Sequence, residues 1–320
     1  MNGGHATDGN ATDGNATDAR TNDGKSSQAR RFGRRTLLVS GLAGLSTIGL
    51  GLSGDTEPGS ASSEPAHRLK NQSNVLVESV HSEARNREVE LVTMCPEGMN
   101  LHDLPVCLML HGRFGDARDS AGGLPTWLTN AVNRGQIPPY AFLAVDGGGN
   151  SYWHSSEDDD PMWMLMEEVP RWLGERGLGG PDGQPAAVSG ISMGGFGALL
   201  YARRRQEHGS PLHAAAVVSP ALLTSWQEMY KRKAFTNSRE WAAIDPLRNI
   251  GALSEVPLGV WCGTKDRFIK GTRRFARLAK PEVVSTSPGT TAATTARRCR
   301  RSSSSSAATS APSPRERLDP

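Results

Sequence analysis

The octapeptide GISMGGFG, residues 190–197, carries a Gly-x-Ser-x-Gly spacing centred on Ser192. A strand-like apolar run precedes this serine and a helix-like segment follows it, which is the arrangement of a nucleophile elbow. Glycines are needed at 190 and 194 because a side chain there would collide with the neighbouring strand or helix. A Gly-rich phosphate loop is the alternative, but the segment lacks a Lys-Ser/Thr end and Gly-x-Gly-x-x-Gly spacing. Ser192 is therefore predicted to attack an acyl carbonyl and to carry the acyl group covalently.

The backbone around Ser192 offers two donors for the oxyanion that forms during acyl transfer. The N–H of Met193 lies at the start of the following helix, a position that suits an oxyanion. The loop HGRFG, residues 111–115, follows an earlier strand, and we assign the second donor to the N–H of Arg113. His111 is a weaker candidate for the catalytic base, because it occupies the oxyanion loop and precedes the nucleophile.

A carboxylate follows a late strand-like run. Asp266 lies in the loop GTKDRF, residues 263–268, where it would orient a histidine and stabilise the imidazolium. The alternative is a solvated aspartate paired with Lys265 or Arg267. Asp245 is a weaker rival for the acid, because Asp-Pro is an ordinary turn start.

Short apolar runs alternate with helix-length segments through the middle of the chain. The predicted strands are Glu88–Met94, Pro105–His111, Tyr140–Asp146, Ala186–Gly190, Ala214–Ser219 and Val256–Cys262. The predicted helices are Ser120–Arg134, Pro161–Arg176, Gly194–Gln206 and Thr272–Ala279. This alternation predicts an α/β fold with a doubly wound, mostly parallel sheet. The candidate residues follow the predicted strands, at the carboxyl edge where such sheets place their chemistry.

Four stretches resemble the putative-esterase family of α/β-hydrolases, in particular exported actinobacterial members. They are LHGRFG from Leu110, AVDGGGNSYWH from Ala144, DPM from Asp160 and SGISMGGFGA from Ser189. The family includes S-formylglutathione hydrolases, feruloyl esterases and secreted mycolyltransferases, and the resemblance covers about residues 75–289. It implies an α/β-hydrolase fold and a serine hydrolase or acyltransferase for small-molecule carboxylic esters, with no cofactor and no metal.

The resemblance also implies roles for single residues. Ser192 would be the nucleophile, Asp266 the triad acid, and Met193 and Arg113 the oxyanion donors. A substrate pocket would be lined by aromatic and histidine side chains, namely His111, Tyr152, Trp153, His154 and Trp163. Packing in the core is the alternative for Tyr152, Trp153 and Trp163, and a substitute base is the alternative for His154.

The family's triad runs in the order serine, acid, histidine, but no histidine follows Asp266 in this chain. All eight histidines come before it. The histidine turn and the last helix of the fold are therefore expected to be missing. A serine without a general base stays a weak nucleophile. The sequence thus leaves two alternatives open, an impaired esterase and a catalytically inactive binding protein or gene remnant.

The composition changes after Pro288 in a way that suggests a cause. Residues 289–300 read GTTAATTARRCR, and five serines follow Arg301. If each codon is shifted back by one base, the stretch can read Gly-His-Asp-Gly-Gly-Tyr-Tyr-Gly-Ala-Pro-Leu-Pro, which resembles the family's histidine turn. We therefore expect a frameshift between about Glu282 and Gly289.

Both ends of the chain differ from its middle. Residues 1–33 contain an ATDGN repeat and residues 285–320 are mainly Ser, Thr, Ala, Arg and Pro, so both are predicted to be disordered. Residues 34–54 begin with a paired arginine before a Gly-rich apolar run, which predicts a twin-arginine export signal. An uncleaved membrane anchor is the alternative. A linker at 55–74 then leads to an α/β-hydrolase domain at 75–284.

Charge and cysteine content limit the partners. A net charge of +3 is too small to indicate a nucleic-acid partner, and the basic run at 297–301 is short and lacks aromatic residues. The four cysteines have no metal-ligand spacing. A disulfide between Cys95 and Cys107 is left open. Contact with a membrane is expected only through the signal or anchor segment.

Overall fold

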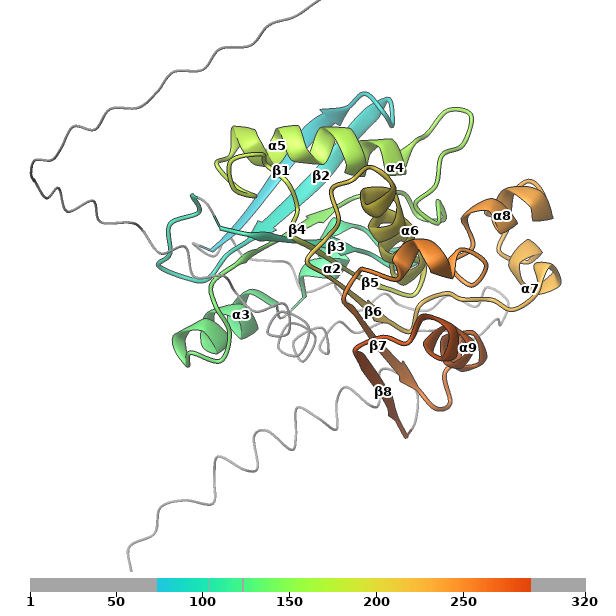
Figure 1. The fold of residues 1–320 in the computed structure, drawn as a ribbon. Helices are drawn as coiled ribbons and strands as arrows, with labels where there is room; N and C mark the ends of the chain where they lie inside the picture. The colour runs from blue at the N-terminus through green and yellow to red at the C-terminus, as the bar shows by residue number, and fades with distance from the viewer. Residues whose placement is uncertain (1–73, 103, 123, 289–320) are drawn as a thin grey trace, which may run out of the picture. The chain divides into compact units, whose positions relative to one another are not determined.

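The computed structural model describes residues 74–102, 104–122 and 124–288, and these build one sheet with helices on both faces (Figure 1). The sheet has eight strands in the order β1-β2-β4-β3-β5-β6-β7-β8. The strands are β1 (Val75–Ser82), β2 (Arg87–Met94), β3 (Val106–Leu110), β4 (Ala141–Val145), β5 (Ala187–Ile191), β6 (Ala214–Val218), β7 (Leu258–Gly263) and β8 (Val283–Ser287). All neighbouring pairs from β4 to β8 are parallel, and β1 and β2 form an antiparallel extension. The predicted α/β class and mostly parallel sheet are confirmed.

The six predicted strands are present as β2 to β7, and the sequence missed the two edge strands. The central strands are nearly continuous apolar runs, such as the wholly buried AFLAV of β4, because both of their faces are covered. β1 and β8 are only partly buried, and their polar residues hide the strand pattern. β8 pairs with β7 from Val283 opposite Gly259 to Ser287 opposite Gly263. The folded chain thus continues past residue 284, where we placed the end of the domain.

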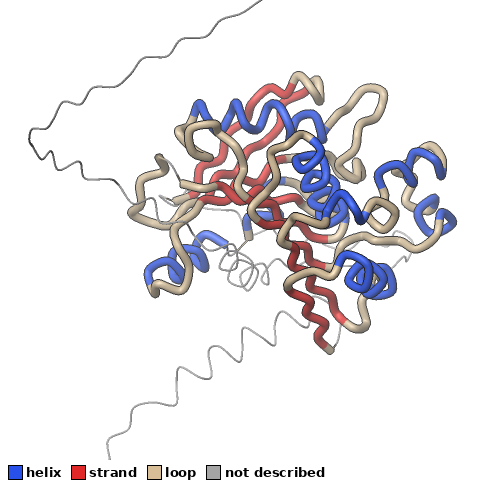
Figure 2. Tube along the Cα trace, viewed as in Figure 1, coloured by secondary structure: helices blue, strands red, loops and turns tan. Residues whose placement is uncertain are grey.

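The four predicted helices are present, but two of them are divided, and three short helical segments between β6 and β7 were not predicted (Figure 2). Their bounds are α2 (Ala117–Ala121), α3 (Leu124–Asn133), α4 (Pro161–Trp163), η3 (Met164–Glu168), α5 (Val169–Glu175), α6 (Met193–Glu207), α7 (Trp226–Tyr230), α8 (Ser238–Ile244), η4 (Ile250–Leu253) and α9 (Ile269–Ala279). The single helix predicted over 120–134 is two helices, because Gly122 leaves the helical conformation. A π-turn, η3, interrupts the helix predicted over 161–176, just before Pro170, which has no N–H to donate to the preceding turn.

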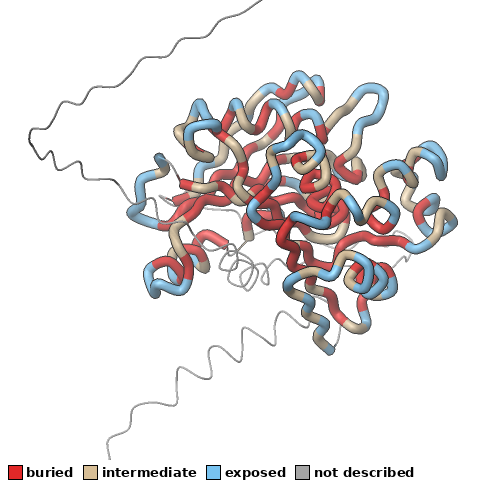
Figure 3. Tube along the Cα trace, viewed as in Figure 1, coloured by how far each residue is buried: buried red, intermediate tan, exposed pale blue. Residues whose placement is uncertain are grey.

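The core lies on both faces of the sheet (Figure 3). The larger buried cluster joins the sheet to α5 and α6 and contains Trp153, Phe196 and Trp241. The smaller cluster joins the other face to α2 and α3, with Leu124 and Leu128 among its members. Two-sided coverage holds the central strands and their carboxyl ends in fixed positions.

Several expectations fall at or beyond the limits of the described residues. The repeat region, the export signal and most of the linker lie within 1–73. Most of the tail in which the histidine turn and last helix are expected to be missing lies within 289–320, so these predictions fall outside the described residues. Within 74–288, no described helix is long and apolar enough to cross a membrane. Cys95 and Cys107 are both free thiols, so the disulfide left open by the sequence is not formed.

Candidate active site

Ser192 occupies a tight turn between β5, which ends at Ile191, and α6, which begins at Met193. Its backbone has φ 55° and ψ −115°, a left-handed conformation that is rare for a residue with a side chain. The turn is fixed by three backbone hydrogen bonds. The Ser192 N–H donates to Val218 O (3.0 Å), and the Ser192 carbonyl accepts from the N–H groups of Phe196 (3.1 Å) and Ala221 (2.8 Å). This is the predicted geometry of strand, serine and helix.

The glycines around Ser192 are required by close packing of backbone. A Cβ at Gly190 would collide with the carbonyl of Gly194, and a Cβ at Gly194 would collide with the carbonyl of Leu110. The elbow therefore presses α6 against the ends of both β5 and β3. Any larger residue at these two positions would push the serine away from the sheet.

The predicted oxyanion donors both lie beside Ser192. Met193 is the first residue of α6, so its N–H has no partner within the helix. Arg113 lies in a turn that is closed by a hydrogen bond from Gly115 N–H to Gly112 O (3.1 Å). A Cβ built on Gly112 would be 3.7 Å from the Ser192 Cβ, so this turn touches the elbow.

Asp266 is buried just after β7 and is held by two hydrogen bonds. Its Oδ2 accepts from the Ser219 hydroxyl (2.8 Å), and its Oδ1 accepts from the Phe268 N–H (2.9 Å). Ser219 follows β6 in a left-handed conformation, with φ 43°. Since β6 lies between β5 and β7, Ser219 lies between the strand that precedes Ser192 and the strand that precedes Asp266. The contact between Ser219 and Asp266 could not be predicted from the sequence, although Ser219 ends a predicted strand.

The chain after β8 leaves the sheet close to Asp266. The carbonyl of Ser287, the last residue of β8, accepts from the Thr264 N–H (2.9 Å), two residues before Asp266. The segment that would follow the acid strand and carry a histidine thus starts beside the candidate acid. Residue 289 and those after it lie outside the described part of the chain.

His111 is buried and links the loops after β3 and β4. Its Nε2 accepts from the Gly147 N–H (2.9 Å), and its Nδ1 donates to the Gly112 carbonyl (2.8 Å). Both nitrogens of His111 are engaged, so it supports the oxyanion loop and has no lone pair to offer Ser192.

The ring nitrogens of His154 also contact backbone carbonyls. Its Nδ1 lies 2.8 Å from Ser155 O and its Nε2 lies 2.8 Å from Ala234 O, so both ring nitrogens face backbone carbonyl oxygens. The ring stacks on Phe235 at 4.4 Å, and the Glu240 carboxylate is 3.7 Å from Nδ1. In this conformation both ring nitrogens of His154 face carbonyl oxygens, so a role as substitute base would require the ring to leave these contacts.

The three aromatic residues predicted to line a substrate pocket differ in how far they are buried. Trp153 is completely buried, and its indole fills the space left by Gly147 and Gly197, so it packs in the core and lines no pocket. Tyr152 is also buried, with its ring edge-on to Phe196 at 5.4 Å. Trp163 lies on α4 with 46% of its surface exposed. The sequence could not show which of these residues are buried in the core, because the space for Trp153 depends on Gly197, which is 44 residues away.

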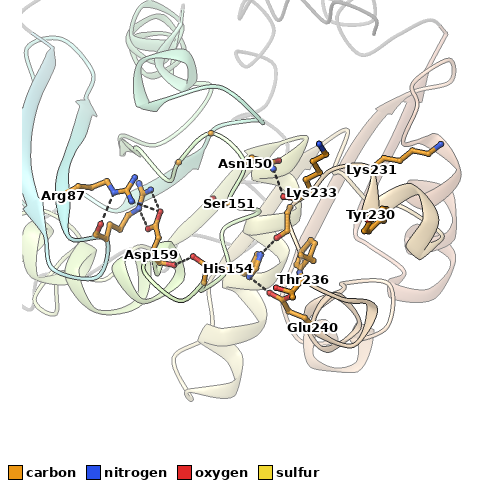
Figure 4. A pocket seen from close by; sticks show the side chains of 16 residues that line it. Arg87, Asn150, Ser151, His154, Asp159, Tyr230, Lys231, Lys233, Thr236 and Glu240 are labelled. Atoms are coloured by element: carbon orange, nitrogen blue, oxygen red, sulfur yellow. Dashed lines mark hydrogen bonds and ion pairs between the residues drawn. The ribbon is translucent and has the colours of Figure 1, made fainter.

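A cavity of about 930 Å³ opens next to the oxyanion loop (Figure 4). One side is formed by the loop 148–159 and the other by the segment 230–240. The two sides are joined by the Asn150 side chain, which donates to Arg232 O (2.9 Å), and by His154, which donates to Ala234 O. Its wall at Gly149 contacts the oxyanion loop, where the Phe114 N–H donates to the Gly149 carbonyl (2.5 Å). Of the predicted pocket residues, His154 lines this cavity. No group of three or more described His, Cys, Asp or Glu residues could hold a metal ion.

The fold has recognisable relatives among solved structures. A ferulic acid esterase is 18% identical with a TM-score of 0.56, over 67% of this chain and 90% of that chain. A thermostable esterase from Pseudomonas putida is 20% identical with a TM-score of 0.50, over 67% of this chain and 73% of that chain. An S-formylglutathione hydrolase from Agrobacterium tumefaciens is 15% identical with a TM-score of 0.49, over 71% of this chain and 92% of that chain. At these identities the likeness concerns the fold alone.

No curated protein matches the sequence. The family described as "Putative esterase" does match, and it covers residues 82–288. This range contains the elbow, the oxyanion loop, the buried aspartate and almost the whole sheet. The chain therefore belongs to the putative esterase family.

Proposed function

We propose that this protein is a serine hydrolase or acyltransferase for carboxylic esters, acting through an acyl-Ser192 intermediate. The observation that carries the proposal is the strained, left-handed Ser192 between β5 and α6, with the Gly112 turn against it. Backbone strain of this kind persists where the surrounding structure imposes it, and it is concentrated at functional sites. Asp266, two strands away, is buried and oriented by Ser219.

The reaction would proceed in two acyl-transfer steps. The Ser192 hydroxyl attacks the ester carbonyl while the carbonyl oxygen gains negative charge. Its proton would pass to a triad histidine where the chain has one, and in the present chain only slowly to water. The N–H groups of Met193 and Arg113 would stabilise that charge before the alcohol leaves with a proton. Water, or a second alcohol, then attacks the acyl-serine and releases Ser192. Asp266 would stabilise a protonated histidine during both steps.

This chain is proposed to perform the reaction poorly. No histidine follows Asp266, and the two histidines nearest to the elbow in the fold have their nitrogens engaged elsewhere. Removing the base of a serine triad costs on the order of 10⁴- to 10⁶-fold in rate. The same observation favours the second candidate, an inactive binding protein or gene remnant with an esterase fold.

A fluorophosphonate probe and intact-mass spectrometry test the proposal. Slow labelling of this chain that disappears in Ser192→Ala would support a serine hydrolase. Labelling that appears only after the frame downstream of about residue 282 is corrected would support the remnant. Equal labelling of the wild-type chain and Ser192→Ala would contradict the assignment of the nucleophile.

Export to the cell envelope or beyond is part of the proposal. Arg34 and Arg35 precede an apolar run that ends near Leu52, the pattern of a twin-arginine signal. The enzyme would then meet its small ester substrates outside the cytoplasm. Replacing both arginines by lysine should leave the protein inside the cell, as measured by fractionation. Unchanged export of that variant would contradict the signal, and membrane-bound protein would favour an anchor.

A further inference from the structure

Three arginines from different loops lie near the buried Tyr152, beside the candidate active site. Arg113 follows β3, Arg232 follows α7 and Arg267 is next to Asp266 after β7. The guanidinium carbons of Arg232 and Arg267 each lie 5.9 Å from the centre of the Phe268 ring. That of Arg113 lies 4.3 Å from the ring of Phe114. Residues from three separate parts of the chain thus bring positive charge to the loops that carry Phe114 and Phe268.

The charges of these arginines converge on the buried Tyr152. Burial raises the pKa of the Tyr152 hydroxyl, and the positive charges of Arg232, Arg113 and Arg267 oppose that rise. Tyr152 packs on Phe196, whose N–H donates to the carbonyl of Ser192. The arginines therefore act on the region within one helical turn of the nucleophile.

Two of the three arginines lack a negative partner in the described part of the chain. Arg232 and Arg267 form no ion pair with any residue of 74–288. The Nε of Arg232 is buried and has no hydrogen-bond acceptor among these residues. A buried donor without a partner is unfavourable, and an oxyanion bound at the Arg232 guanidinium would offset the cost of burying this cation. Lys231 and Lys233, which flank Arg232 and line the cavity (Figure 4), add to the positive charge.

We infer that the ester substrate carries an oxyanion, a carboxylate or a phosphate, which Arg232 binds with support from Arg267 and Arg113. The inference rests on the proposed function, since it names the substrate class of the same site. The planar guanidinium matches carboxylate and phosphate oxygens in geometry, and the aromatic rings of Phe114 and Phe268 hold the cations in place. Arg232 is the main specificity residue because its position is fixed from both sides, by Asn150 at its carbonyl and by Phe268 at its guanidinium.

Equilibrium binding in the Ser192→Ala chain tests the inference without requiring turnover. The probes are monomethyl glutarate, with a carboxylate on the acyl part, 2-acetoxyethyl phosphate, with a phosphate on the alcohol part, and neutral methyl pentanoate. We expect at least one anionic ester to bind about tenfold more tightly than the neutral ester, as one charge-assisted hydrogen bond would provide. Arg232→Met should abolish that preference and leave the affinity for methyl pentanoate unchanged. Arg232→Lys should retain part of it.

Arg134→Met is the matched control. Arg134 is an exposed arginine just after α3, and its substitution removes the same charge at another place in the protein. Thermal unfolding of each variant separates lost binding from lost folding. Equal affinity for charged and neutral esters, no binding of any probe, or an equal loss in Arg134→Met would overturn the inference. Selective binding without covalent labelling of Ser192 would leave the inference intact and refute the catalytic proposal. Covalent labelling of Ser192 without selective binding would refute the inference and leave the catalytic proposal intact.

Discussion

The turn at Ser192 and the edge strand β8 are stabilised in different ways. Ser192 follows a buried strand, and the two glycines beside it have no room for a Cβ. β8 is a half-exposed edge strand of mixed polar residues, and it is held to the sheet by pairing with β7 alone. The elbow is thus fixed by the packing of the whole core. The base would depend on a segment attached to the least buried strand, so a change there can remove catalysis while the rest of the fold survives.

Restoring the frame after about residue 282 is the strongest test of this contrast. The corrected chain should place a histidine at position 290, shortly after β8 ends beside Thr264. We expect its kcat/KM for a simple aryl ester to exceed that of the present chain by roughly 10⁴-fold or more, because a triad base contributes that much. The measurement is steady-state hydrolysis, with Ser192→Ala in the corrected chain as control. A corrected chain as inactive as its Ser192→Ala variant would mean that the elbow is not catalytic.

Asp266→Asn should have different effects in the two chains. In the corrected chain it would leave the histidine without its acid and lower kcat by roughly 10³- to 10⁴-fold. In the present chain there is no histidine to orient, so residual activity should change by less than about threefold. Steady-state rates of both pairs give the comparison. A large loss in the present chain would show that Asp266 has a catalytic partner other than a downstream histidine.

Gly194→Ala tests how tightly the elbow is packed. The new Cβ would collide with the Leu110 carbonyl, and such overpacking costs about 1–3 kcal/mol or more in the free energy of unfolding. Gly174→Ala in α5 is the matched control, since its Cβ would meet no atom within 4 Å. That variant should be stabilised by about 0.5–1 kcal/mol through helix propensity. Urea unfolding of both variants measures the difference, and equal stabilities would refute the close approach of α6 to β3.

Asp245, the weaker candidate for the triad acid, is predicted to affect the pH dependence of unfolding. Burial raises its pKa to about 6, despite the Leu247 N–H and the charges of Arg248 and Arg274. Its carboxyl therefore binds a proton more tightly in the folded state than in the unfolded state. Its contribution to stability should be complete below about pH 4 and should decline as the pH rises through about 6, by up to about 3 kcal/mol. Asp245→Asn should remove this part of the pH dependence of unfolding, and an unchanged profile would contradict the raised pKa.

Much of the fold could be predicted because its signals are local. Buried central strands such as AFLAV are continuous apolar runs, and Gly-x-Ser-x-Gly between a strand and a helix needs no distant information. The edge strands β1 and β8 could not be found in this way, since half-exposed strands contain polar residues that resemble loops. The break between α2 and α3 depends on the conformation of Gly122, which the helical pattern around it concealed.

The sequence by itself determined the esterase family, the elbow at Ser192 and the absence of a histidine after Asp266, because these depend on residue order and short-range spacing. Only the tertiary structure decided that Ser219 holds Asp266, that Trp153 belongs to the core and that both ring nitrogens of His154 face backbone carbonyls. These outcomes rest on contacts between distant residues, 47 positions apart for Ser219 and Asp266 and 80 for His154 and Ala234. The same side chain can act as a base, donate a hydrogen bond or pack in the core. Which of these it does depends on neighbouring residues that come together only when the chain folds.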